Sequence, residues 1–167
     1  MMLTQYENFF TDHLCNELLG TARFLMEKGD YVFATNLRWN PLIVKDSFPV
    51  FMHALNIESN LYRECKHQIE TKIQLPIKND CIMIYYWTRL SYIPWHDDEN
   101  HTGALTVYLN EEWDEDWGGY FLYKEDETIK AILPKKNFAL LQQGGIKHAT
   151  TPVHLNGGIR FTIQTFF

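Results

Sequence analysis

The chain has 167 residues, 46% of them hydrophobic and 22% charged, with a formal net charge of -6. This composition excludes a disordered chain, and the length fits one domain over residues 1–167 with a substantial buried core. The acidic balance, with no basic stripe, argues against a nucleic-acid partner. No apolar run is long enough to span a membrane, so we expect no membrane partner. Near the N-terminus no cationic segment precedes an apolar stretch, so we expect no secretory signal and a cytoplasmic protein.

The first 80 residues are predicted to form a helical support region. Thr11 to Lys28 repeats apolar residues at helical spacing, with a capping residue at its start and Gly29 after its end. Ser59 to Thr71 shows the same period and predicts a second helix. Between the two helices, Tyr31 to Leu37 resembles a strand, and a connection containing Pro41 and Pro49 follows it.

From residue 81 to residue 167 the chain is rich in short β-type runs separated by glycine turns. The expected strands are Cys81–Trp87, Ala104–Leu109, Gly119–Tyr123, Thr128–Leu133, Phe138–Gln142 and Ile159–Phe166. Many short strands of this kind favour a mainly β (α+β) fold, a sandwich or a barrel, with the N-terminal helices packed on one sheet. The acidic run over residues 111–116 is expected to be a solvated loop. Three separated cysteines, Cys15, Cys65 and Cys81, argue against a disulfide framework or a structural zinc site.

One short motif carries the first chemical signal. His96 and Asp98 are two residues apart, so on an extended segment both side chains point to the same side. His148 follows the Gly144-Gly145 turn and could complete the site from a neighbouring strand. Two histidines and one carboxylate on one face of a metal are typical of non-haem Fe(II) oxygenases. An H-x-D triplet also occurs in polar loops that bind no metal.

Arg160 strengthens the metal hypothesis, because it lies inside an otherwise apolar β-run. A buried arginine is costly unless an anion satisfies it, and its planar fork suits a carboxylate. The anion could be a ligand, or it could be one of the chain's own acidic residues.

Taken in order, these motifs resemble the Fe(II)/2-oxoglutarate-dependent oxygenase superfamily, in its prolyl-hydroxylase-like branch. The resemblance covers Cys81 to Phe167. It depends on the H-x-D motif at His96 and Asp98 and on three later segments: Trp117-Gly-Gly-Tyr-Phe-Leu-Tyr123, His148-Ala-Thr-Thr-Pro-Val153 and Arg160-Phe-Thr-Ile163.

The resemblance implies a double-stranded β-helix, or jelly roll, and a dioxygenase that hydroxylates a C–H bond. It implies Fe(II) held by the catalytic residues His96, Asp98 and His148, with 2-oxoglutarate and O2 as co-substrates, and it allows ascorbate as an accessory reductant.

The same resemblance implies a co-substrate site, with 2-oxoglutarate bound by Arg160, Tyr108, Tyr86 and Thr162. The segment from His148 to Arg160 is slightly longer than the branch usually shows, and Lys147 is a weaker candidate for the anchor.

The substrate stays open at this point. A proline-containing peptide or protein is the first expectation, with Tyr86, Trp87, Tyr92 and Trp95 as an apolar wall for the ring. A free amino acid or another small molecule is the alternative within the superfamily. A cupin-type metalloenzyme without an oxo acid, or a non-catalytic jelly-roll binding module, would explain the strand pattern without explaining Arg160.

Overall fold

The computed structural model describes residues 2–30, 32–34, 50–99 and 101–167, and the description below concerns those residues. Its helices are α1 (Asp12–Glu27) and α2 (Asn60–Ile73), with short 3₁₀ turns at Lys78–Asp80 and Glu115–Trp117. The strands are β1 (Met2–Tyr6), β2 (Val32–Ala34), β3 (Val50–Ala54), β4 (Ile82–Trp87), β5 (Ile93–His96), β6 (Gly103–Tyr108), β7 (Phe121–Glu125), β8 (Thr128–Ile132), β9 (Ala139–Gln143), β10 (His148–Thr150) and β11 (Arg160–Phe166).

Both predicted helices form, with capping residues at the predicted starts. The Thr11 hydroxyl accepts a hydrogen bond from the amide of Leu14, and the Ser59 hydroxyl accepts one from the amide of Tyr62. Such bonds satisfy amides that the first helical turn leaves without partners. The apolar side of each helix packs on the sheet, and Cys65 of α2 is fully buried there. Phe24 projects from the other side of α1 into solvent.

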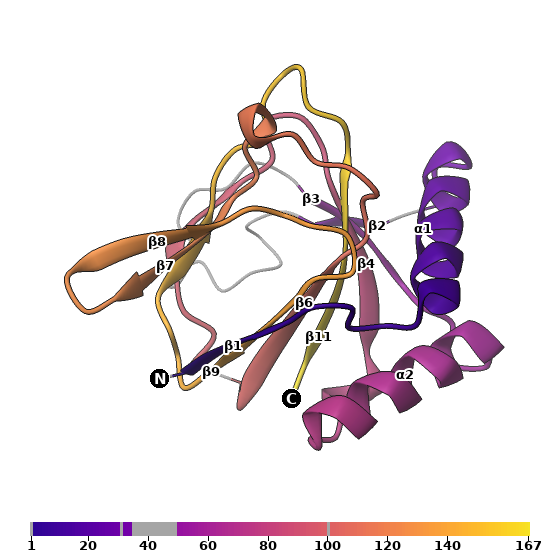
Figure 1. The fold of residues 1–167 in the computed structure, drawn as a ribbon. Coiled ribbons are helices and arrows are strands. Elements are labelled where there is room, and N and C mark those ends of the chain that lie inside the picture. The colour runs from indigo at the N-terminus through magenta and orange to yellow at the C-terminus, as the bar shows by residue number, and fades with distance from the viewer. Residues whose placement is uncertain (1, 31, 35–49, 100) are drawn as a thin grey trace.

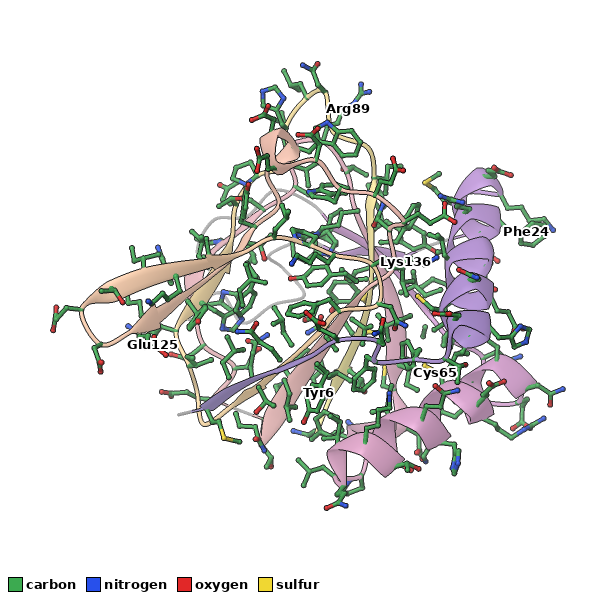
Figure 2. All side chains as sticks on the ribbon, viewed as in Figure 1. Tyr6, Phe24, Cys65, Arg89, Glu125 and Lys136 are labelled. Carbon is green, nitrogen blue, oxygen red and sulfur yellow. The ribbon has the colours of Figure 1, made fainter. Side chains whose placement is uncertain are left out.

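The strands form two antiparallel sheets. The larger has the order β1-β9-β6-β11-β4-β3-β2 and the smaller β5-β10-β7-β8. In Figure 1 the helices lie on one side of the larger sheet and the smaller sheet lies on the other. The β7–β8 hairpin projects away from this body, with Glu125 near its tip (Figure 2). Because the larger sheet is covered on both faces, β4 is buried along its whole length and β6 is buried except at Thr106.

Strand β4 shows how the two faces are used. Its alternate residues Ile82, Ile84 and Tyr86 belong to the core under the helices. Met83, Tyr85 and Trp87 belong to a second core, which includes residues of the smaller sheet's side such as Ile93 and Val153. Successive side chains of a strand point to opposite faces, so this parity decides which residues can reach the space between the sheets.

All six β-type runs predicted after residue 80 form strands, and the mainly antiparallel β architecture with few helices is confirmed. The first 80 residues are not only helical, because β1 and β3 extend the larger sheet at its two sides. Of the predicted strand Tyr31–Leu37, residues 32–34 are extended, while Tyr31, residues 35–37 and the Pro41–Pro49 connection lie outside the described residues. In the part of the chain that is described, neither helix is long and apolar enough to cross a membrane.

Candidate active site

The structure brings His96, Asp98 and His148 together. Strands β5 and β10 pair in antiparallel fashion with His96 opposite His148, and Asp98 follows at the end of β5. One donor atom from each of the three residues lies within 4.8 Å of the others, and Asp98 Oδ2 is 3.6 Å from His148 Nε2. The imidazole rings are 4.2 Å apart between centroids. Two imidazole nitrogens and a carboxylate at this spacing can hold one metal ion.

The two histidines are fixed in the tautomer that a metal requires. His96 Nδ1 lies 2.7 Å from the carbonyl oxygen of Pro94, and His148 Nδ1 lies 2.8 Å from that of Ile146. Each Nδ1–H therefore donates to a backbone carbonyl two residues earlier. The lone pair of each ring is left on Nε2, and the hydrogen bond prevents the ring from turning away.

Burial keeps His148 neutral. The side chain is 6% exposed, and burial together with the neighbouring His96 lowers the pKa of His148 to about 4, against the opposing effect of Asp98. A neutral imidazole has a lone pair for a metal at physiological pH, whereas a protonated imidazole does not. His96 is 9% exposed, so both rings reach the surface only slightly.

Arg160 is the second unusual feature of the interior. Its side chain is 2% exposed and points into the space between the sheets, where its guanidinium carbon lies 4.3 Å from the ring centroid of Trp87. One terminal nitrogen donates to the carbonyl oxygen of Gly119, but Nε has no hydrogen-bond partner. Within the described residues no carboxylate pairs with this cation.

The guanidinium of Arg160 is therefore free to bind an anion that is not one of the described acidic residues. Burial lowers the pKa of Arg160 to about 10, so the group is still charged at neutral pH. Gly119 allows the guanidinium to lie close to the backbone, because a Cβ at this position would be only 3.1 Å from a guanidinium nitrogen. Its φ of 67° also suits glycine. Lys147, the weaker anchor candidate, is exposed.

Tyr108 and Thr162 share the interior with Arg160. They face each other in the register of β6 and β11, and both are almost completely buried. The guanidinium carbon of Arg160 lies 5.7 Å from the Tyr108 ring centroid, and burial raises the pKa of Tyr108 to about 12, so its hydroxyl keeps its proton. The Thr162 hydroxyl accepts a hydrogen bond of 3.2 Å from the indole N–H of Trp87. A cation and two hydroxyls are thus available to one carboxylate.

The prediction for Tyr86 needs correction. Tyr86 lies in the core under the helices, edge-on to Phe161, on the opposite face of the sheet from Arg160. Its neighbours Tyr85 and Trp87 point into the interior instead. For the same reason Tyr86 and Trp87 cannot belong to one apolar wall. Trp87, which the sequence placed in the apolar wall for the substrate ring, instead contacts the guanidinium of Arg160.

Comparison with protein families gives a match to the 2OG-Fe(II) oxygenase superfamily over residues 81–167, more than half of the chain. No curated protein sequence matches the chain. Members of this superfamily use Fe(II), 2-oxoglutarate and O2, so the match favours this chemistry over a cupin-type enzyme or a binding module.

Solved structures support the same fold. A prolyl-4-hydroxylase from Pseudomonas putida is similar over 99% of this chain and 91% of its own, with a TM-score of 0.76 and 15% identity. A prolyl hydroxylase from Trichoplax adhaerens, solved with a hypoxia inducible factor peptide fragment, has a TM-score of 0.80 over 99% of this chain and 83% of its own, also at 15% identity. A viral collagen prolyl hydroxylase from Paramecium Bursaria Chlorella virus-1 has a TM-score of 0.71 over 99% of this chain and 95% of its own, at 15% identity. The chain thus belongs to the 2OG-Fe(II) oxygenase superfamily and is a 2-oxoglutarate- and Fe(II)-dependent dioxygenase.

Proposed function

We propose that His96, Asp98 and His148 hold the iron and that Arg160, Tyr108 and Thr162 bind the distal carboxylate of 2-oxoglutarate. We also propose that the two sheets form a double-stranded β-helix and that residues 1–167 act as one catalytic domain. The metal assignment is supported by the 4.8 Å cluster of donor atoms and by the two fixed Nε2 lone pairs.

The observation that carries the co-substrate assignment is the buried Arg160 without an acidic partner among the described residues. When bound, iron and 2-oxoglutarate supply the oxidation that places one oxygen atom from O2 in a substrate C–H bond. The protein's own groups do the positioning. Trp87 holds the guanidinium by stacking, Gly119 orients one of its nitrogens, and the remaining N–H groups are left for a carboxylate.

We infer that the substrate is a proline-containing peptide or protein, which the enzyme hydroxylates. The similar structures include prolyl hydroxylases, one of them solved with a peptide, and this likeness motivates the choice without deciding it. Trp95, next to His96 on β5, is 37% exposed and contacts Lys124 on the opposite side of the strand from the His96 ring, so it is not part of a substrate wall at the metal site. The exposed acidic residues between Glu111 and Asp116 would disfavour polyanionic substrates.

The test is to incubate the Fe(II)-loaded enzyme and 2-oxoglutarate with three kinds of substrate: a set of proline-containing peptides, free proline and alkylated single-stranded DNA. Succinate and product mass are measured together. We expect a gain of one oxygen on a peptide, and the His96→Ala variant is the control. Turnover of free proline alone would reassign the enzyme to small-molecule hydroxylation. Demethylation of the DNA would contradict both the substrate class and the electrostatic reasoning.

A further inference from the structure

Gln142, on β9, is a buried polar residue that the chemistry described so far does not use. Its side chain is 5% exposed, and its Oε1 atom has no hydrogen-bond partner. It points between the sheets, because its neighbour Leu141 lies in the core under the helices and Leu140 packs with Tyr108 in the interior. Buried side-chain acceptors without donors are rare in folded proteins, so this one requires an explanation.

The carboxamide lines a small hollow beside the metal ligands. Asp98, His101, Gln142, Gly145 and His148 all contribute to its wall. Two of the three iron ligands therefore border the same space as the unpartnered oxygen. Gly145, with a φ of 64°, forms the turn at one side. The space is small, so only a single polar group of a larger molecule could enter it, and that group would lie next to Asp98 and His148; the space is hereafter called the Gln142 hollow.

The Gln142 hollow lies at the other end of the strands from the co-substrate anchor. Gln142 is paired with Ala104 of β6, whereas Arg160 packs beside Tyr108 of the same strand. Four residues of extended chain separate Ala104 from Tyr108, roughly 13 Å. A 2-oxoglutarate molecule anchored at Arg160 would thus leave the Gln142 hollow free.

The chemistry of the residue indicates what the second molecule offers. Methionine has nearly the same length and would fill this position without leaving an acceptor unsatisfied. Glutamine instead places a neutral carboxamide there, whose oxygen needs an N–H or O–H donor. Its neutrality also matters, because a carboxylate here would add a second negative charge beside Asp98.

We propose that Gln142 is a substrate-recognition residue, whose carboxamide oxygen accepts a hydrogen bond from an N–H or O–H group of the substrate near the carbon that is oxidised. This inference rests on the proposed function, and for a peptide substrate the donor is a backbone N–H close to the proline. Binding the substrate would then supply the partner that Gln142 lacks and hold the target carbon toward the metal.

The test compares Gln142→Met with Gln143→Met as the matched control. Gln143 is the same residue type on the same strand, with its side chain on the other face and outside the Gln142 hollow. For each protein we would measure Mn(II) and 2-oxoglutarate binding, the melting temperature, and kcat and KM for the peptide that the parent enzyme hydroxylates best. The ratio of succinate to hydroxylated product is recorded in the same assay.

We expect Gln142→Met to raise the peptide KM about tenfold to a hundredfold and to release more succinate per product, because the substrate donor loses its partner. Metal stoichiometry and 2-oxoglutarate binding should stay at the parent values. The melting temperature should be unchanged or higher. Gln143→Met should match the parent throughout. If Gln142→Met fails to fold, Gln142→Leu takes its place in the same assays.

A second comparison identifies the partner. The backbone N–H groups flanking the proline are N-methylated one at a time, and methylation of the donor that meets Gln142 should raise KM for the parent but not for Gln142→Met. A peptide KM within twofold of the parent in Gln142→Met would overturn the inference, as would a lower melting temperature with loss of metal, which indicates a structural role. If the parent enzyme oxidises none of the peptides, the proposed function itself fails, and the inference fails with it.

Discussion

Replacing Arg160 by methionine tests the co-substrate site most directly. Methionine can occupy a buried position on β11 and contact Trp87, but it carries neither charge nor N–H donors. We expect the variant to bind iron or manganese with the parent's stoichiometry, since the Arg160 guanidinium contacts Gly119, Trp87 and Tyr108 and none of the three proposed metal ligands. Binding of 2-oxoglutarate should be severely weakened.

The expected size of the loss follows from the environment of the guanidinium. Its only hydrogen bond within the described residues goes to the Gly119 carbonyl, so the other N–H groups are available for a carboxylate in a buried setting. Truncating one partner of a buried, hydrogen-bonded charge pair costs about 2–5 kcal/mol. This range of energies corresponds to a Kd for 2-oxoglutarate that is higher than the parent's by a factor of roughly thirty to a few thousand.

The stability of the apoprotein should change much less. The substitution removes a buried, uncompensated cation, which favours the fold, but it also removes the contact with Trp87 and the bond to Gly119. The two effects oppose each other, so we expect the free energy of unfolding to change by less than about 2 kcal/mol. A large destabilisation would indicate that Arg160 is mainly a structural residue.

The assay is calorimetric titration of 2-oxoglutarate into the Mn(II)-loaded protein without oxygen, with Arg160→Lys as the conservative control. Lysine keeps the charge but lacks the planar fork, so it should restore only part of the affinity. If Arg160→Met binds 2-oxoglutarate within threefold of the parent, the carboxylate is anchored elsewhere and the assignment of Arg160 is refuted.

The other predictions concern the metal, the hydroxyls and pH. Titration of Fe(II) or Mn(II) should detect no binding to His96→Ala or Asp98→Ala, and unchanged stoichiometry in both would eliminate this metal site. Tyr108→Phe should weaken 2-oxoglutarate by about three- to tenfold through loss of one hydrogen bond, while Tyr86→Phe, on the opposite face, should leave its Kd unchanged. The pKa of His148 is lowered to about 4, so the unfolded chain takes up this proton first as pH falls below about 6.5. The free energy of unfolding of the apoprotein should therefore fall between pH 6.5 and 4, by at most about 3 kcal/mol. Chemical denaturation at several pH values should show a weaker dependence of this free energy on pH in His148→Leu.

The sequence predicts those parts of the site that depend on local spacing. His96 and Asp98 share one side because they are two residues apart on an extended segment, and no tertiary information is needed for that. The turn before His148 allowed it to be considered as the third ligand, but choosing it needed the family resemblance, since β10 has only three residues and gives no periodic signal. Strand β5 was missed because it contains Pro94, which is tolerated there because β5 is an edge strand.

The error at Tyr86 has a different cause. Local alternation predicts that Tyr86 and Trp87 face opposite sides, but it does not say which side contains the ligand. That choice depends on which face of the sheet the two helices cover, and the alternation along β4 carries no information about this tertiary packing. Gln142 could not be assigned to the site for the same reason. The sequence shows a polar residue in an apolar strand, but its position beside Asp98 and His148 depends on the order of the strands in the sheets.

The two unpartnered polar atoms are the basis of our proposal that the interior binds two ligands. Arg160 Nε and Gln142 Oε1 both lack hydrogen-bond partners among the described residues, and they differ in charge and in role, one being a donor and the other an acceptor. A single small ligand could not satisfy both, because the residues contact opposite ends of β6. Each position therefore favours one kind of ligand group. An anion binds favourably beside Arg160 but is repelled by Asp98 near Gln142, whereas a neutral N–H or O–H group binds favourably to Gln142 but not to the Arg160 cation. Separation of these two preferences across the metal ligands would keep the oxo acid and the substrate from competing for one position.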